Sequence, residues 1–228
     1  MTLARADSAV GEVALRSRGE VVELVVGGVF VMDTVDTSTE IELATTALAR
    51  HAAPRRVLVG GLGLGFTAAA VLTDGRVEEV VVAEIAAPLV DWAARGLLPA
   101  DGLRDPRLDV RPVDVAEVLR RTPGEWDLVL LDVDNGPGFL VRPENAGLYG
   151  ATGLRAAVAA LAPGGLLAIW SSHRAPDLYA SLAAVCPGPV SEVVRRVLRE
   201  GRDLEYAIYL AAAQPGARTD LSTSPTGG

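Results

Sequence analysis

The sequence predicts an α/β fold in which a doubly wound, mostly parallel sheet is covered by helices on both faces. Two observations predict it. From Arg55 onward, short runs rich in Val, Leu and Ile alternate with Ala- and Leu-rich stretches of helical length. The first of these runs also leads directly into a glycine-rich turn. Alternation at this spacing is typical of parallel strands joined by helices, so we expect a Rossmann-like domain.

The N-terminal part is predicted to be β-rich. Three short apolar runs between residues 11 and 33 are separated by Arg18-Gly19 and Gly27-Gly28, which is the pattern of a small hairpin or meander. We therefore assign residues 1–36 to an N-terminal β extension. Thr37 is followed three residues later by Glu40, and this spacing predicts a capping box at the start of a helix.

Residues 37–213 are expected to form the main domain. Its predicted strands are 56–60, 77–84, 108–113, 127–132, 164–172, 193–198 and 205–211. Its further helices are expected near 65–73, 86–97, 114–121, 144–162 and 177–185. The last two strands are joined by so few residues that they predict an antiparallel hairpin at the edge of a seven-stranded sheet. Residues 214–228 are polar and rich in Gly, Pro, Ser and Thr, so we expect a disordered tail.

Composition excludes several classes of function. All 21 basic residues are Arg, which excludes Schiff-base chemistry and a Lys-dependent P-loop. One Cys and two His exclude an internal disulfide and a His/Cys zinc site. The net charge of −8 is opposite to that of nucleic-acid binders. No apolar run reaches the roughly 20 residues of a membrane span, and no secretory signal is recognised. We expect a cytoplasmic protein that acts on a small or cationic substrate.

A glycine-rich loop is the most informative motif. The strand 56–60 runs into Gly61, Gly63 and Gly65, and glycines there allow the backbone to turn tightly and approach a ligand. The spacing is GxGxG rather than the GxGxxG of dinucleotide sites, which disfavours nicotinamide cofactors. Glu84 ends the next strand, where an acid can bind ribose hydroxyls. The alternatives are a turn that only packs helix on sheet and an ordinary helix-entry charge at Glu84.

Further acids follow the next two strands. Asp114 is expected either to cap its helix or to reach an adenine amino group. Asp132 leaves its strand toward the crevice, where a carboxylate could hold or deprotonate an amine, although a structural role in the loop is the alternative. His173, just after the fifth parallel strand, is a candidate general base, with a solvated loop position as the alternative. Acceptor-site residues are expected near 33–40, 132–149 and 171–176.

Taken in this order, the glycine loop, Glu84, Asp114 and the Asp132 loop resemble the class I S-adenosylmethionine-dependent methyltransferase fold. The segment VFVMD, the loop LDVDNGPGF and Tyr149 resemble, more specifically, the spermidine synthase (aminopropyltransferase) branch. The resemblance implies that the backbone at 61–65 borders the donor's tail, Glu84 binds both ribose hydroxyls and Asp114 approaches adenine. It further implies that Asp132 is the reaction-site carboxylate, with Tyr149 as a catalytic candidate.

Two departures from that branch decide between activities. Aminopropyltransferases usually carry an acid in the glycine loop, where this chain has Leu64, and a second loop acid where it has Asn135. Because a buried ammonium without its carboxylates is costly, we expect methyl transfer from S-adenosylmethionine to a small nucleophile. The alternatives are aminopropyl transfer from decarboxylated S-adenosylmethionine to an amine, and a non-catalytic module that binds adenosyl metabolites. A homodimer packed through residues 21–33 is a further expectation.

Overall fold

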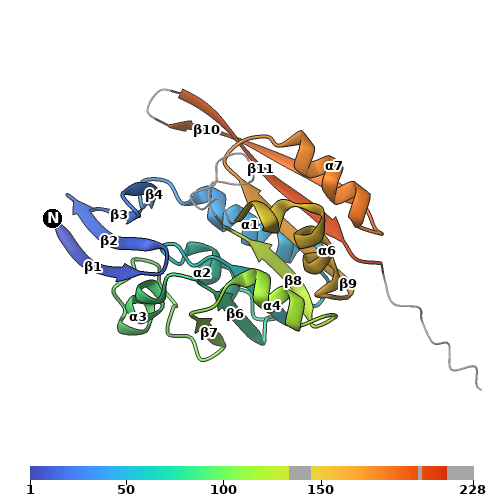
Figure 1. Ribbon diagram of the computed structural model, residues 1–228, viewed down its shortest axis with the longest axis horizontal. Helices are drawn as coiled ribbons and strands as arrows, with labels where there is room; N and C mark the ends of the chain where they lie inside the picture. The colour runs from blue at the N-terminus through green and yellow to red at the C-terminus, as the bar shows by residue number, and fades with distance from the viewer. Residues whose placement is uncertain (134–144, 200–201, 215–228) are drawn as a thin grey trace, which may run out of the picture.

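The computed structural model describes residues 1–133, 145–199 and 202–214, and its strands form two sheets (Figure 1). The smaller sheet is antiparallel, in the order β1-β2-β3-β4. The larger sheet has seven strands in the order β10-β11-β9-β8-β5-β6-β7. The predicted fold class is therefore confirmed, including the antiparallel edge hairpin.

The smaller sheet contains one strand that the sequence analysis did not predict. Its strands are β1 (Thr2–Ser8), β2 (Gly11–Arg18), β3 (Val21–Val26) and β4 (Val29–Asp33). The strand β1 was missed because its inward-facing positions are small alanines, which give little apolar signal. The buried side of the sheet, with Val13, Leu15 and Leu24, belongs to the same core cluster as the first helices of the main domain. The division of the chain into domains stays a prediction.

The larger sheet places five parallel strands side by side. They are β5 (Arg56–Gly60), β6 (Glu79–Ala83), β7 (Leu108–Arg111), β8 (Trp126–Leu131) and β9 (Leu161–Ser171). The hairpin of β10 (Val190–Arg199) and β11 (Arg202–Ala212) adds to β9 in the antiparallel sense. The strand β5 pairs with both β6 and β8, so the loop after β5 lies between the loops that follow its two neighbours.

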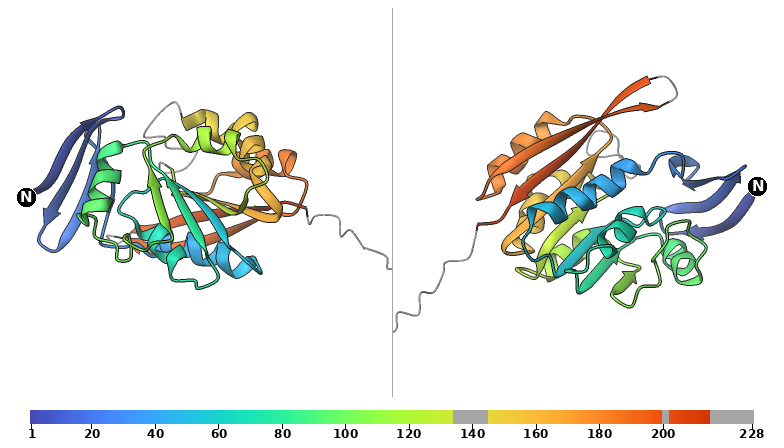
Figure 2. Two further views of the ribbon diagram at one scale, coloured as in Figure 1. Left: turned by 90° about the horizontal axis from the view of Figure 1, so that it is seen from below. Right: turned by 180° about the vertical axis from the view of Figure 1, so that it is seen from behind.

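Helices cover both faces of this sheet (Figure 2). One face carries α1 (Ser38–Arg50), α2 (Phe66–Leu72) and α3 (Ala87–Arg95). The other carries α4 (Val115–Arg121), α5 (Ala146–Tyr149), α6 (Ala151–Ala159) and α7 (Pro176–Val185). Alternate residues of one strand enter different cores: Val57 and Val59 pack with α1 to α3, whereas Leu58 packs on the opposite side. This alternation follows from the two-residue period of a strand. No helix in the described ranges has the length and apolar character that crossing a bilayer requires.

Two local predictions were wrong. The Thr37 side chain makes no capping hydrogen bond, and the backbone of Thr37 (φ −115°, ψ 12°) lies outside the β region that a capping residue usually adopts. The long helix expected near 144–162 is divided at Gly150, whose extended backbone (φ −76°, ψ 166°) separates α5 from α6. The positions of Asn135 and of the predicted disordered tail beyond residue 214 lie outside the described residues.

Candidate functional site

The glycine loop is held between the ends of two neighbouring strands. The N–H of Gly61 donates to the carbonyl of Ala83 at the end of β6 (2.9 Å), and the N–H of Asp132 donates to Gly60 (2.8 Å). Gly61, Gly63 and Gly65 have φ values of 89°, 52° and 96°, a region that side-chain-bearing residues rarely adopt. A Cβ at Gly61 would overlap the carbonyl oxygen of Asp132. The loop therefore needs glycine both for its conformation and for this close approach.

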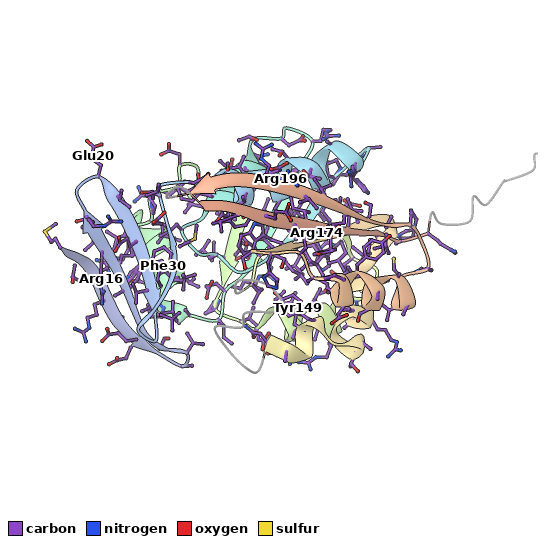
Figure 3. The ribbon with its side chains drawn as sticks, turned by 90° about the horizontal axis from the view of Figure 1, so that it is seen from above. Arg16, Glu20, Phe30, Tyr149, Arg174 and Arg196 are labelled. Carbon is purple, nitrogen blue, oxygen red and sulfur yellow. The ribbon has the colours of Figure 1, made fainter. Side chains whose placement is uncertain are left out.

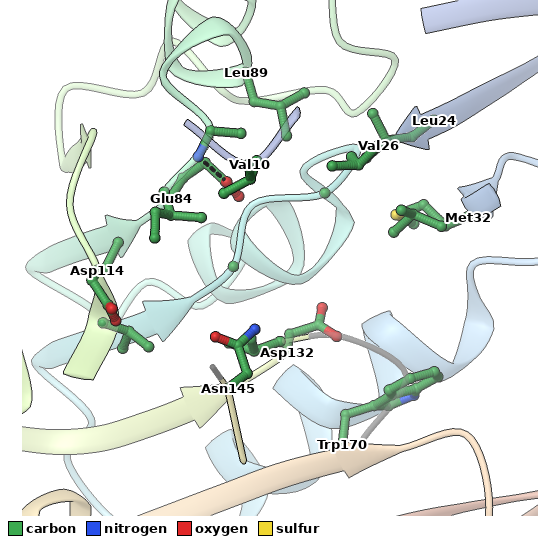
Figure 4. A pocket seen from close by; sticks show the side chains of 18 of the residues that line it. Val10, Leu24, Val26, Met32, Glu84, Leu89, Asp114, Asp132, Asn145 and Trp170 are labelled. Carbon is green, nitrogen blue, oxygen red and sulfur yellow. Dashed lines mark hydrogen bonds between the residues drawn. The ribbon is translucent and has the colours of Figure 1, made fainter. Parts of the chain in front are cut away.

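Glu84 lies on one side of this loop, and its carboxylate is hydrogen-bonded to the surrounding backbone. Its side chain is buried, and one carboxylate oxygen accepts the N–H of Leu62 at 2.9 Å. The other accepts the N–H of Ala86 at 2.7 Å (Figure 4). Burial raises the pKa of Glu84, while these backbone donors favour the ionised form and oppose the shift. Glu84 also lines the cavity, where a carboxylate can accept a hydrogen bond from a ligand hydroxyl.

Asp132 lies on the other side of the loop, in different surroundings. Its Oδ2 accepts the hydroxyl of Thr67 at 2.6 Å. Burial, followed by the charge of Glu40 on α1, raises the pKa of Asp132 to about 7, and the Thr67 hydrogen bond acts in the opposite direction. A carboxyl with a pKa near neutrality can exchange a proton with a substrate under physiological conditions.

One cavity joins the two sides. Figure 4 shows Glu84 and Asp114 on one side of the loop, and Asp132, Met32 and Trp170 on the other. Apart from the backbone of the loop, the described wall consists of apolar side chains from sheets, helices and loops, of Asn145, and of four acids, which are Glu40, Glu84, Asp114 and Asp132. Among the described residues that line it, none is Arg or His. Parallel α/β sheets bind ligands beyond the carboxyl ends of their strands, which is where this cavity lies.

The other predicted site residues have definite places. The Oδ1 of Asp114 accepts the N–H of Ala116 at 2.8 Å, so Asp114 caps α4 and also lines the cavity. Tyr149 is buried on α5, and its hydroxyl donates to the carbonyl of Val133 at 2.5 Å. His173 lies beside Ser172, with 3.2 Å between Nδ1 and the Ser172 hydroxyl. Neither Tyr149 nor His173 is among the described residues that line the cavity, and their catalytic roles stay predictions.

Three residues at the site were not predicted as functional: Met32, Thr67 and Trp170. Met32 on β4 places its Sδ 3.3 Å from the N–H of Leu64, beside the glycine loop. Leu64 itself is fully buried in the core, so Met32 forms the wall next to the position where an acid was expected. Glu40 was named individually only as a capping residue, although it lies in the stretch 33–40 where acceptor-site residues were expected, and it lines the cavity. Contacts between distant elements produce this arrangement, and no local sequence pattern indicates them.

A second cavity adjoins the first. The two share Val31, Met32, Glu40 and Trp170, and the second is further lined by acids and aromatic rings, including Asp33, Phe30 and Tyr206. Phe30 lies on the N-terminal sheet, whereas Tyr149 lies with α5 away from that sheet (Figure 3). The stretches near 33–40 and 171–176, where acceptor-site residues were expected, contribute Asp33 and Ser172 to the lining of this second cavity.

The comparisons with known proteins agree with this architecture. No family model matches the chain. It is 29% identical over 160 residues to polyamine aminopropyltransferase 2 of Pseudomonas aeruginosa, covering 66% of this chain and 44% of that protein. It is 31% identical over 152 residues to a spermidine synthase of Dictyostelium discoideum, covering 62% of this chain and 51% of that protein. The chain spans about half or less of the length of these curated relatives.

A solved structure extends the likeness to most of the chain. A spermidine synthase in complex with the transition-state analogue AdoDATO superposes with a TM-score of 0.78 and 20% identity, over 92% of this chain and 73% of that chain. At this identity the match shows the fold. The chain thus has a class I S-adenosylmethionine-dependent methyltransferase-like fold. Within that class its resemblance to the spermidine synthase-like branch is confirmed.

The comparisons also bear on the expected reaction. The relatives carry the names of aminopropyltransferases and spermidine synthases, so they do not support methyl transfer as the main interpretation. They support the alternative given beside it, aminopropyl transfer. The inference in favour of methyl transfer that was drawn from Leu64 is therefore not supported. Leu64 is buried in the core, and the acids that line the cavity come from α1, from the ends of β6 and β8 and from the start of α4.

Proposed function

We propose that this protein is a transferase that binds an adenosyl sulfonium donor in the main cavity and passes an aminopropyl group to a small amine. The observation that carries the proposal is the single cavity in which Glu84 and Asp132 flank the glycine loop on opposite sides. Glu84 would bind the ribose hydroxyls, and Asp114 would lie toward the adenine. Asp132 would lie at the transferred group.

The charge of the cavity favours a decarboxylated donor. The tail of S-adenosylmethionine carries a carboxylate, whereas the tail of its decarboxylated form ends in an ammonium alone. Asp132 and Glu40 line the side of the cavity where the transfer would occur, which is the reaction end. No described lining residue offers a positive charge there. A carboxylate would meet like charge in a poorly solvated site, whereas an ammonium would be attracted. The donor that suits this wall is therefore decarboxylated S-adenosylmethionine.

The donor supplies an electrophilic carbon bonded to a positively charged sulfur. The protein's share of the chemistry is to align the two substrates, exclude water and accept a proton. In the proposed reaction the neutral amine forms a new C–N bond to the aminopropyl carbon while the C–S bond breaks. Both electrons of that bond return to sulfur, and 5′-methylthioadenosine leaves. The amine proton passes to Asp132, whose pKa of about 7 suits this exchange.

Product analysis tests the proposal against its competitors. The purified protein is incubated with either donor and a panel of small amines, and the nucleoside product is identified by mass spectrometry. We expect 5′-methylthioadenosine from the decarboxylated donor. Release of S-adenosylhomocysteine from S-adenosylmethionine would assign methyl transfer instead. Binding of both donors without any product across the panel would support the non-catalytic module.

A further inference from the structure

Thr67 occupies a buried position in the first turn of α2, directly after the glycine loop. Only 2% of the residue is exposed, and its hydroxyl donates to Oδ2 of Asp132 at 2.6 Å. A hydroxyl-to-carboxylate hydrogen bond of this length is charge-assisted and stronger than a neutral one. The bond therefore joins the start of α2 to the end of β8 at the reaction end of the cavity.

The bond leaves the two oxygens of Asp132 in different states. Oδ2 is engaged by Thr67, while Oδ1 has no hydrogen-bond partner among the described residues. The two oxygens of a carboxylate lie at a fixed angle in one plane, so a hydrogen bond that holds one oxygen also restricts the direction in which the other points. Asp132 lines the cavity, so the oxygen that stays unengaged is the one able to meet a ligand.

We propose that Thr67 is a positioning residue for the transfer reaction: its hydroxyl fixes Asp132 so that one carboxylate oxygen faces the transferred group and the incoming amine. This inference rests on the proposed function and deepens it. Thr67 itself is not among the described residues that line the cavity, so it acts through Asp132.

The electrostatics of the cavity give the bond a second role. Three acids face the same space as Asp132: Glu40 from α1, Glu84 after β6 and Asp114 before α4. Burial of Asp132 and the negative charge of Glu40 favour its protonated form, and the Thr67 hydroxyl is the described hydrogen-bond donor that favours the ionised form. Removal of the hydroxyl would leave Asp132 both less well oriented and harder to ionise.

Two substitutions separate the hydroxyl from the shape of the side chain. Thr67→Val keeps the branched shape and removes the donor, whereas Thr67→Ser keeps the donor and removes a methyl group. We expect Thr67→Val to lower kcat/KM by about tenfold or more, chiefly through kcat. The midpoint of its pH–rate profile should move upward by about one unit. Thr67→Ser should retain the wild-type midpoint and most of the activity.

Binding of 5′-methylthioadenosine provides the control, because this nucleoside lacks the cationic tail and reports the adenosyl end alone. Its Kd should be the same in all three proteins. If Thr67→Val has the wild-type pH midpoint, or if both variants lose nucleoside binding and activity together, the positioning role is overturned. If the wild type releases no 5′-methylthioadenosine from the decarboxylated donor with any amine, the proposed function fails, and that result is visible before any variant is made.

Discussion

Glu84 and Asp132 are carboxylates at the ends of the two strands that flank β5, yet their surroundings differ. Glu84 accepts backbone N–H groups on both oxygens, so its position is fixed by the same loops that it supports. Asp132 accepts one side-chain hydroxyl and faces the negative charge of Glu40. The comparison indicates that the Glu84 side of the cavity, which is the proposed adenosyl end, is part of the fold. The Asp132 side, which is the proposed reaction end, is a site whose charge is set by a few side chains.

The difference has a physical consequence for substitution. A change at the adenosyl end leaves buried backbone donors without partners, which reduces both ligand binding and the free energy of unfolding. Replacement of Asp132 at the reaction end removes a poorly solvated negative charge, so it impairs function and raises the free energy of unfolding. The predictions below test whether the two ends separate in this way.

The largest effect is expected for Gly61→Ala, in the loop that joins both ends. The added Cβ would overlap the carbonyl oxygen of Asp132, and alanine is strained at a φ of 89°. We expect loss of 5′-methylthioadenosine binding and a decrease of about 3 kcal/mol in the free energy of unfolding. Gly28→Ala is the matched control, because Gly28 has a φ of 80° and nothing lies within 4 Å of its added Cβ. Its cost should be about 1 kcal/mol from the backbone alone.

Urea denaturation and calorimetric titration measure the two quantities. An equal loss of stability in Gly61→Ala and Gly28→Ala would show that the contact with Asp132 costs nothing. The loop would then tolerate a side chain at residue 61, contrary to the close approach described above.

Glu84→Gln tests the adenosyl end. Glutamine keeps the shape, but its NH₂ group must face one of the two backbone donors that the carboxylate now accepts. We expect binding of 5′-methylthioadenosine to weaken about tenfold or more and the free energy of unfolding to fall by about 1–3 kcal/mol. Glu78→Gln is a control on the surface, where the side chain is 67% exposed. Unchanged stability in Glu84→Gln would show that this end is not integral to the fold.

The placement of Glu84 beside the glycine loop could be predicted from the sequence because its determinants are local. Gly61, Gly63 and Gly65 follow an apolar strand, and Glu84 ends the next one, so strand alternation alone brings them together. The mostly parallel sheet and its edge hairpin were predictable from equally local patterns, whereas the order of the strands was not predicted. The missed strand β1 shows the limit, since small residues bury too little surface to produce a clear pattern.

The reaction end was only partly predictable, because it is assembled from distant segments. Asp132 was visible as an acid at a strand end, but its partner Thr67 lies 65 residues earlier in the chain. Met32 reaches the loop from the N-terminal sheet, and no spacing rule relates these positions. Contacts between side chains of different elements depend on packing, which neither the hydrophobic period nor the secondary-structure propensity of a segment encodes.

Asp132→Asn sharpens the comparison through pH. The unfolded chain releases the Asp132 proton near its ordinary pKa of 3.8, whereas the folded protein retains it up to about 7. Wild-type stability should therefore fall as the pH rises from 4 to 7 on account of this group. Asparagine does not titrate, so above pH 7 the variant should be more stable than the wild type by on the order of 2 kcal/mol. Urea denaturation at several pH values measures the difference.

Function should move in the opposite direction. Affinity of the wild type for the decarboxylated donor should rise as Asp132 ionises, and this rise should be absent in Asp132→Asn. Asp114→Asn is the control within the same cavity, because asparagine caps a helix as well as aspartate does. A stability difference between wild type and Asp132→Asn that does not change with pH would contradict a raised pKa at this residue.

The smallest effect is expected at Trp170, which lines the reaction end. Its indole N–H is buried without a hydrogen-bond partner among the described residues, whereas that of Trp126 donates to the Thr122 hydroxyl at 2.7 Å. Trp126 also packs beneath the Arg56 guanidinium, 5.0 Å from the ring centroid. Trp170→Phe removes an unsatisfied donor beside an existing cavity, so we expect a change in the free energy of unfolding within about 1 kcal/mol. Trp126→Phe breaks a buried hydrogen bond and opens a void, which should cost about 1–3 kcal/mol. Equal costs for the two variants in urea denaturation would mean that the reaction end is as integral to the fold as the core, and the contrast between the two ends would not hold.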